Sequence, residues 1–303
     1  MMKYITSLTK DELLHNCVIL CKSIDDYPCI LIKNSIEKTN VSSFSTDNLE
    51  FRMNTVLEND NTTYNFHIIK SKKNDFVSVQ QFTVVFDYIF KKIQKPIDDS
   101  ELYILIDSIQ EYFRITTESD KYALQIGVFG ELLSIKHLYE NGYQDIVKKY
   151  HKNFYSKHDI EISDKCRVEI KTTSSTNRIH RFGHDQIYRQ DVDVYVISSI
   201  LEPSEEGTSL YEMFMKVMEL YNNPDSIFAL QKLMKRCGVS NTDEGLKFAL
   251  KKAVNDLRFY DAQSLPRIEQ AAPNGVTNIA YDVDCSLANS MLLSQFVDIL
   301  NKQ

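Results

Sequence analysis

Apolar residues recur at helical spacing near the middle of the chain. Between residues 122 and 140, Leu124, Val128, Ile135 and Leu138 occupy four of the five positions of a 4-3-4-3 spacing. This spacing is typical of a helix with one buried face. Asn141-Gly142 follows as a natural left-handed C-terminal signal. The pattern predicts a helix over about 122–140 in which Glu131 occupies the missing position of the apolar stripe.

Two short segments after this helix alternate between apolar and polar residues, which predicts strands with one apolar face each. The segments are Asp159–Ser163 and Arg167–Lys171. If they form a hairpin whose apolar faces coincide, an odd-length turn such as Asp164–Cys166 places Asp159 opposite or diagonal to Glu169 and Lys171. A two-residue turn would place them on opposite faces.

The remaining pattern predicts strands and helices on both sides of a polar stretch, Thr116–Asp120, where we place a domain boundary. The predicted first domain, residues 1–120, is α+β, with strands at Cys29–Ile32, Leu49–Val56 and Tyr64–Ile69 and helices at Val77–Ile93 and Ser100–Phe113. The predicted second domain, residues 121–303, continues with a strand at Val192–Ile200, a helical insertion at about 209–259, a late strand at Val276–Val283 and a C-terminal helix. This order predicts an α/β fold with a small mixed central sheet flanked by helices.

Composition narrows the class of protein. With 303 residues, 43% of them apolar, the chain can bury a substantial core. Its apolar runs fall far short of the roughly 20 residues that span a bilayer, and its N-terminus lacks a signal-peptide pattern, so we expect a cytoplasmic protein without a membrane partner. The six cysteines lack CxxC spacing. They predict reduced thiols rather than a zinc ribbon or a disulfide framework.

Charge is distributed unevenly along the chain. The formal net charge of -7 argues against a protein that coats nucleic acid by bulk charge. Residues 121–200 nevertheless contain twelve Lys or Arg against ten Asp or Glu, a local balance of +2. Arg178, Arg181 and Arg189 suggest a phosphate-facing edge, with a solvated loop as the alternative. His180 and His184 lack a third zinc-type ligand, so no zinc site is assigned.

The acidic residues and the lysine suggest a catalytic site. Burying Glu131 without a partner would cost several kcal/mol, so it requires a metal, a base, a hydrogen-bond network, a structural salt bridge or an exposed helix end. Asp159 and Glu169 on adjacent strands would suit Mg²⁺, which prefers a few oxygen ligands. Lys171 beside them could orient a water molecule during phosphodiester hydrolysis. Alternating charges alone are common on surface strands, but together these features indicate a site.

At these residues the sequence resembles the PD-(D/E)XK nuclease superfamily. The resemblance is carried by Gly130-Glu131-Leu132-Leu133, His158-Asp159-Ile160 and Val168-Glu169-Ile170-Lys171-Thr172-Thr173. More narrowly, the chain resembles PD-(D/E)XK-motif proteins encoded beside restriction methyltransferases and helicase-like ATPases, which share a late element like Leu265–Ile268 and a segment like Gly275-Val276 with Tyr281. The superfamily's signature proline is absent, because Lys157-His158 precedes the aspartate.

The resemblance implies a restriction-endonuclease-like core and Mg²⁺-dependent cleavage of double-stranded DNA, with Mn²⁺ as a substitute, in a restriction or phage-defence system. Asp159, Glu169 and Glu131 would bind the metal, and Lys171 would be catalytic. Thr172, Thr173 and Gln186 would join the three arginines in contacting DNA, although the threonines could equally be loop filler and Gln186 part of a polar helix face. The protein would act as a homodimer or in an assembly with a methyltransferase and an ATPase.

Two other functions fit the same residues. One is a nuclease fold that binds DNA or organises a complex with little or no cleavage of its own. The other is a structural interaction protein, in which the charged strand faces are solvated and an arginine pairs with Glu131. Metal binding that depends on Asp159 and Glu169 would separate an enzyme from such a scaffold.

Overall fold

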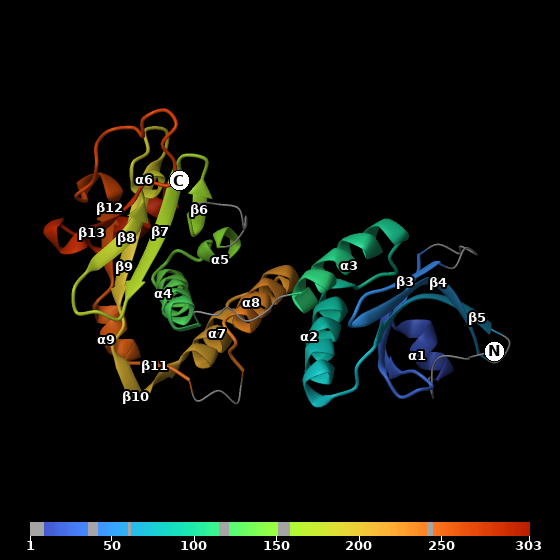
Figure 1. Cartoon of the computed structure of the whole chain (residues 1–303). Coiled ribbons are helices and arrows are strands. Elements are labelled where there is room, and N and C mark those ends of the chain that lie inside the picture. The colour runs from blue at the N-terminus through green and yellow to red at the C-terminus, as the bar shows by residue number, and fades with distance from the viewer. Residues whose placement is uncertain (1–8, 36–41, 60–61, 115–120, 151–157, 241–244) are drawn as a thin grey trace. The chain divides into compact units, whose positions relative to one another are not determined.

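The computed structural model describes residues 9–35, 42–59, 62–114, 121–150, 158–240 and 245–303. The chain forms two compact units, one of residues 1–115 with 223–228 and the other of residues 116–222 with 229–303. The elements of both are drawn in Figure 1. The polar stretch Thr116–Asp120 and Lys157 lie outside the described residues. Among the described helices, none has the length and apolar character needed to cross a membrane.

The first unit contains an antiparallel sheet with apolar residues on both faces. Its strand order is β1-β2-β5-β4-β3, with bounds Val18–Lys22, Pro28–Lys33, Thr62–Ser71, Leu49–Asn59 and Ser42–Ser45. Helices α2 (Phe76–Lys92) and α3 (Asp99–Arg114) contribute to the core on one face, and α1 (Lys10–His15) contributes to the smaller core on the other. The three strands and two helices predicted in this region are confirmed. Strands β1 and β3 were not predicted.

The second unit is built on a small mixed sheet, as the sequence predicts. The sheet has four strands in the order β12-β9-β7-β6. The strands are β6 (Ile160–Ser163), β7 (Cys166–Thr173), β9 (Asp193–Ile200) and β12 (Arg258–Asp261). β7 and β9 run parallel, while the outer strands are antiparallel to their neighbours. Helix α4 (Lys121–Glu140) packs against β7 (Figure 1), and α10 (Leu293–Asn301) contacts β12.

Smaller elements surround this sheet. They are α5 (Ile146–Lys149), β8 (Ile179–Gly183), α6 (His184–Ile187), β10 (Pro203–Ser209), α7 (Leu210–Met218), α8 (Pro224–Arg236), β11 (Lys247–Phe248), α9 (Leu250–Asn255), β13 (Ala280–Asp284) and the 3-10 turns η1 (Ala262–Ser264) and η2 (Cys285–Leu287). The region 209–259 is therefore not wholly helical, because β11 and the start of β12 lie within it. The late strand starts at Ala280 rather than Val276 and pairs with β8, which was not predicted.

The hairpin of β6 and β7 differs from the predicted one in its turn. Ser163 pairs with Cys166, so the turn has only two residues, Asp164 and Lys165. The register then shifts between Glu161 and Ser163, and Ile160 pairs with Val168. This bulge changes the pairing by one residue, which offsets the effect of an even-length turn. Continuing the register by one pair places Asp159 across from Glu169, as the odd-length turn was expected to do.

Helix α4 lies very close to β7 at Gly130. A Cβ atom added to this glycine would lie 1.8 Å from Oγ1 of Thr172, a distance that no side chain can tolerate. Thr172 is itself held by Ser199, whose Oγ donates a hydrogen bond to Thr172 Oγ1 over 3.1 Å. The glycine therefore sets the spacing between helix and strand at the position next to Glu131.

We predict that Gly130→Ala destabilises the protein by about 1–3 kcal/mol, because the helix must move away from Thr172. Gly127→Ala is the matched control, since no atom lies within 4 Å of its added Cβ. This control should be neutral or stabilising by up to about 1 kcal/mol, because alanine favours helix more than glycine does. Urea unfolding of both variants measures the difference, and equal midpoints for Gly130→Ala and wild type would contradict the close approach.

Candidate active site

Glu169 and Lys171 point away from α4. Because side chains alternate along a strand, Thr172, which faces Gly130, lies on the opposite face of β7 from these two residues. On their own face they lie near β8 and α6. The Nζ atom of Lys171 is 5.1 Å from the centre of the Phe182 ring on β8. Glu169 and Lys171 therefore lie together on one face of the sheet.

The Glu169 carboxylate is the most deeply buried group of the site, with 2% of the residue exposed. Its Oε1 lies 2.6 Å from Lys171 Nζ and accepts a hydrogen bond from Gln186 Nε2 over 2.7 Å. Its Oε2 is buried and has no hydrogen-bond partner among the described residues. A buried polar atom left in this way normally costs about 1–3 kcal/mol, so it calls for a further ligand.

Asp159 lies immediately before β6. Its Oδ2 accepts a hydrogen bond from the backbone N–H of Ile170 over 2.6 Å, which fixes the carboxylate beside β7. The preceding residue, His158, is buried, and its Nε2 donates to the carbonyl of Gln186 over 3.1 Å. The segment that carries Asp159 is thus held by both β7 and α6.

Glu131 reaches the site from α4 and is half-buried. The hydroxyl of Tyr150, a buried residue just after α5, donates a hydrogen bond of 2.6 Å to Glu131 Oε2. Tyr150 also forms an isolated backbone bridge with Ile160, the residue after Asp159. Tyr150 therefore links the helix that carries Glu131 to the strand that follows Asp159.

The three carboxylates are close enough to influence one another. Burial, followed by the charges of Glu169 and Glu131, raises the pKa of Asp159 well above its usual value. Burial is also the main cause that raises the pKa of Glu169 to about 7, with Glu131 and Asp185 adding to it and Lys171 opposing it. Negative charge is therefore concentrated here beyond what Lys171 offsets, a condition typical of functional sites.

Gln186 connects the acid and the base. Its Nε2 donates to Glu169, while its Oε1 accepts from the backbone N–H of Gly183 over 2.8 Å and from Lys171 Nζ over 3.3 Å. The sequence predicts that Gln186 contacts DNA, with a place on a polar helix face as the alternative. The structure places its amide within the site.

Late segments of the chain hold the short helix α6 in place. His184 at its start bonds to the Tyr281 hydroxyl over 3.2 Å and to the Gln270 carbonyl over 2.8 Å. Arg267 Nη1 donates to the carbonyl of Ile187 at its end over 2.9 Å. The late Leu265–Ile268 element and Tyr281 thus fix the helix from which Gln186 reaches Glu169 and Lys171.

The residues present fit a divalent cation such as Mg²⁺. Among the described residues, no group of three or more His, Cys, Asp and Glu side chains is already arranged to hold a metal ion. Asp159 and Glu169 nevertheless each have one oxygen in a hydrogen bond, and the second oxygen of Glu169 is buried without a partner in the described part of the chain. Mg²⁺ commonly uses one or two carboxylates and keeps several waters, so this pair, with Glu131 nearby, meets its requirements.

The structure contradicts one of the predicted DNA contacts, that of Arg178. Arg178 is buried, with its guanidinium donating to Ser198 Oγ and carbonyl and to the carbonyl of Asp256, so it cannot face a phosphate. Thr172 is half-buried between Gly130 and Ser199, and its contact with DNA stays a prediction. The sequence pattern could not predict the burial of Arg178, because its partners Ser198 and Asp256 lie 20 and 78 residues away along the chain.

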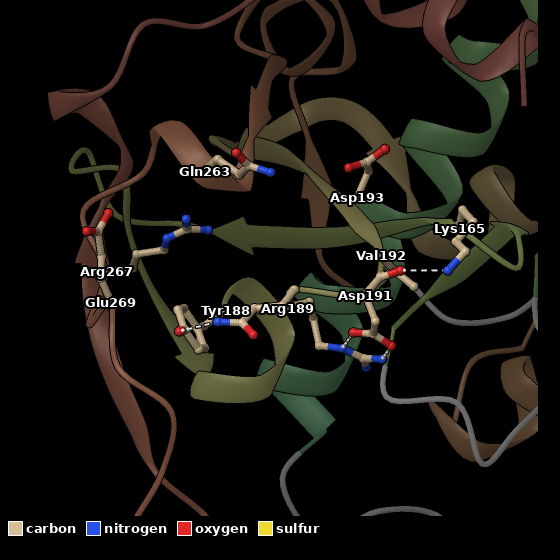
Figure 2. Close-up of a pocket in the computed structure, with 10 residues that line it drawn as sticks. Lys165, Tyr188, Arg189, Asp191, Val192, Asp193, Gln263, Arg267 and Glu269 are labelled. Atoms are coloured by element: carbon tan, nitrogen blue, oxygen red, sulfur yellow. Dashed lines mark hydrogen bonds and ion pairs between the residues drawn. The ribbon is translucent and has the colours of Figure 1, made fainter.

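The other predicted contacts lie nearer the surface. Thr173 Oγ1 accepts a hydrogen bond from the backbone of Ser175, and Arg181 is an exposed residue 3.6 Å from Asp282. Arg189 forms a two-bond ion pair with Asp191, visible in Figure 2 at the edge of a pocket beside α6. DNA contact by these three residues stays a prediction.

One family model matches almost the whole chain. It is described as "Putative PD-(D/E)XK family member, (DUF4420)" and matches residues 3–286, which include every residue of the site. Comparisons with curated proteins and with solved structures find no match. The mixed sheet of the second unit, flanked by helices, is consistent with a restriction-endonuclease-like fold, as predicted.

The raised pKa of Glu169 predicts a pH dependence of stability in the metal-free protein. A carboxyl whose pKa rises from 4.5 to about 7 on folding stabilises the fold fully below pH 4.5, and this stabilisation is lost as the pH rises through 7. We expect a loss of about 3 kcal/mol over that window, measured by urea unfolding. Glu169→Gln should reduce this pH dependence, with the remainder due to Asp159, whose pKa is also raised, whereas Glu161→Gln on β6 should leave it unchanged. A wild-type curve that rises from pH 5 to 7 would contradict the burial of this carboxylate.

We further predict that Tyr150→Phe destabilises the protein by about 1–3 kcal/mol, because the hydrogen bond from Tyr150 to the Glu131 carboxylate is lost. Tyr143→Phe is the matched control, since Tyr143 is equally buried but its hydroxyl has no hydrogen bond among the described residues. Thermal unfolding compares the two variants. Equal losses of stability in the two variants would contradict a stabilising contribution from the hydrogen bond to Glu131.

Proposed function

The chain belongs to the DUF4420 family of PD-(D/E)XK-type proteins, and from this membership and the geometry of its site we propose that it is a metal-dependent DNA endonuclease. Its biological setting would be a restriction or phage-defence system. The observation that supports the proposal most strongly is the buried Glu169 carboxylate, which has one oxygen on Lys171 and Gln186 and the other without a partner among the described residues.

Asp159 and Glu169 would hold the metal, and Glu131 would be a further ligand or would anchor a water molecule. When bound, Mg²⁺ or Mn²⁺ supplies polarisation of the scissile phosphate and a water of lowered pKa. The raised pKa values of Asp159 and Glu169 support this assignment, because a cation would offset the burial and the repulsion between carboxylates that raise them. Bound protons and a bound cation then compete for the same oxygens.

Lys171 would act on the reacting groups directly. Its ammonium is held against Glu169 Oε1 and near Gln186 Oε1, and 20% of its side chain is exposed. From this position it can orient the attacking water and balance negative charge as it grows on the phosphate. Gln186 would keep acid and base at a fixed separation, since its amide bonds to both.

Double-stranded DNA is the substrate that we propose, with cleavage by a homodimer or by an assembly that includes a methyltransferase and an ATPase. One active centre cuts one strand, so a double-strand break requires two centres or two events. The net charge of -7 favours an assembly in which another chain contributes to DNA affinity.

A test is incubation of the purified protein with methylated and unmethylated plasmid DNA in Mg²⁺ or Mn²⁺. We expect nicking or linearisation that requires the metal and falls roughly 100- to 1000-fold in Lys171→Ala, while DNA binding persists. Lys148→Ala, an exposed lysine on α5 that pairs with Asp145, serves as the control. Cleavage unchanged by Lys171→Ala would reject this site. DNA binding without cleavage in the wild type would favour the alternative, a nuclease fold retained for binding or architecture.

A further inference from the structure

The three carboxylates of the candidate active site share one feature, which is that the fold supplies a donor to one oxygen of each. The pairs are Lys171 Nζ with Glu169 Oε1, the backbone N–H of Ile170 with Asp159 Oδ2, and the Tyr150 hydroxyl with Glu131 Oε2. The distance between the two atoms is 2.6 Å in every pair. Each carboxylate therefore has at least one oxygen that is already engaged.

This pattern limits how the carboxylates can bind a cation. An oxygen that accepts a short hydrogen bond shares its negative charge with the donor, and the positive hydrogen of the donor repels a cation. A cation therefore binds better at the other oxygen of the same carboxylate. Ligation through both oxygens of one carboxylate is disfavoured at all three groups.

Divalent cations differ in the ligation that they require. Mg²⁺ demands octahedral geometry at about 2.0–2.1 Å, keeps several waters and takes only a few protein oxygens. Ca²⁺ is larger, takes about six to eight oxygens at about 2.3–2.6 Å and readily uses both oxygens of one carboxylate. A site that offers one oxygen from each carboxylate therefore suits Mg²⁺ better than Ca²⁺.

Tyr150 is the one donor of the three that does not belong to β7. The donor of Ile170 is a backbone group of that strand, and Lys171 is the proposed catalytic lysine. Tyr150 is buried just after α5, where its backbone N–H donates to the carbonyl of Ile146 over 3.1 Å and its backbone forms the bridge with Ile160. Its hydroxyl is thus held in place, and removing this one oxygen atom leaves the donors of β7 intact.

We propose that Tyr150 is a positioning residue that makes the site selective for Mg²⁺ over Ca²⁺, because it occupies Oε2 of Glu131 and so restricts Glu131 to one ligand oxygen. The inference rests on the proposed function, with Glu131 as a ligand of the metal. It gives the hydrogen bond between Tyr150 and Glu131 a role in metal selectivity in addition to its contribution to stability.

The experiment measures metal binding by the full chain without DNA. The EPR signal of free Mn²⁺ follows Mn²⁺ binding, and competition with Mg²⁺ and with Ca²⁺ gives the Kd of each. We expect Tyr150→Phe to lower the ratio of the Ca²⁺ Kd to the Mg²⁺ Kd roughly tenfold, because Glu131 can then use both oxygens. An unchanged ratio would overturn the proposal.

Tyr221→Phe is the matched control for this change. Tyr221 and Tyr150 are both 7% exposed, but the Tyr221 hydroxyl is buried without a hydrogen-bond partner among the described residues. Its removal should leave the ratio of the two Kd values as it is in wild type. A shift of equal size in Tyr221→Phe would show that the loss of any buried hydroxyl changes the ratio, which contradicts a specific role of Tyr150.

A double variant tests whether Tyr150 acts through Glu131, because Tyr150→Phe also loses stability. In a Glu131→Gln background the carboxylate is gone, so adding Tyr150→Phe should leave the ratio of the Kd values unchanged. If Tyr150→Phe shifts the ratio as much in this background as in wild type, its effect comes from a disturbed fold and the proposal is overturned.

Infrared difference spectra of metal binding provide a readout that does not depend on stability. The two carboxylate stretching bands lie further apart when one oxygen binds a cation than when both do. The bands that Glu131→Gln removes belong to Glu131, and we expect the one-oxygen separation in wild type and the two-oxygen separation in Tyr150→Phe with Ca²⁺. A two-oxygen separation in wild type, or no response of Glu131 to either cation, would contradict the proposal.

Failure of the proposed function would have a different signature. If wild type does not bind Mn²⁺, or if Glu169→Gln leaves Mn²⁺ binding unchanged, no cation occupies this site and both proposals are overturned. If Mn²⁺ binding depends on Glu169 but Tyr150→Phe does not change the ratio of the Kd values, the metal site stands and only the role of Tyr150 is overturned.

Discussion

The burial of Glu169 in the middle of β7 is the constraint on which the rest of the site depends. A carboxylate with 2% of its residue exposed is expensive to keep ionised, and the fold supplies only part of the compensation. Lys171 and Gln186 satisfy one oxygen, while the other has no partner among the described residues. Burial and neighbouring acids therefore raise its pKa to about 7. The Glu169 carboxylate is therefore stabilised by binding either a proton or a cation.

This constraint explains the positions of several elements of the second unit. The bulge in β6 brings Asp159 across from Glu169 in spite of an even-length turn. Gly130 allows α4 to approach β7 closely enough for Glu131 to join the acidic group. Helix α6, held by Arg267 and by the Tyr281–His184 bond, presents Gln186 to both Glu169 and Lys171. Strand register, helix packing and a late segment thus converge on one carboxylate.

Much of this arrangement could be predicted from the sequence because it follows local periodicity. The interrupted stripe of α4 identified Glu131, and the alternation of the two strands identified Asp159, Glu169 and Lys171. Features set by tertiary contact were missed. Nothing near Tyr150 in the sequence indicates that its hydroxyl reaches Glu131, and the basic run after Lys171 gave no sign that β8 turns Arg178 into the core. The sequence indicates Arg267 only as part of the late element, because its bond to Ile187 joins residues 80 positions apart.

The most direct test of the account is the pKa of Glu169 measured by NMR titration of its side-chain carboxyl carbon, without and with saturating Mg²⁺. Glu169→Gln identifies the resonance. The account predicts a pKa of about 7 in the metal-free protein and a marked decrease when Mg²⁺ is added, because the cation competes with the proton for the buried carboxylate. A pKa near 4.5 without metal, or one that Mg²⁺ does not change, would contradict it.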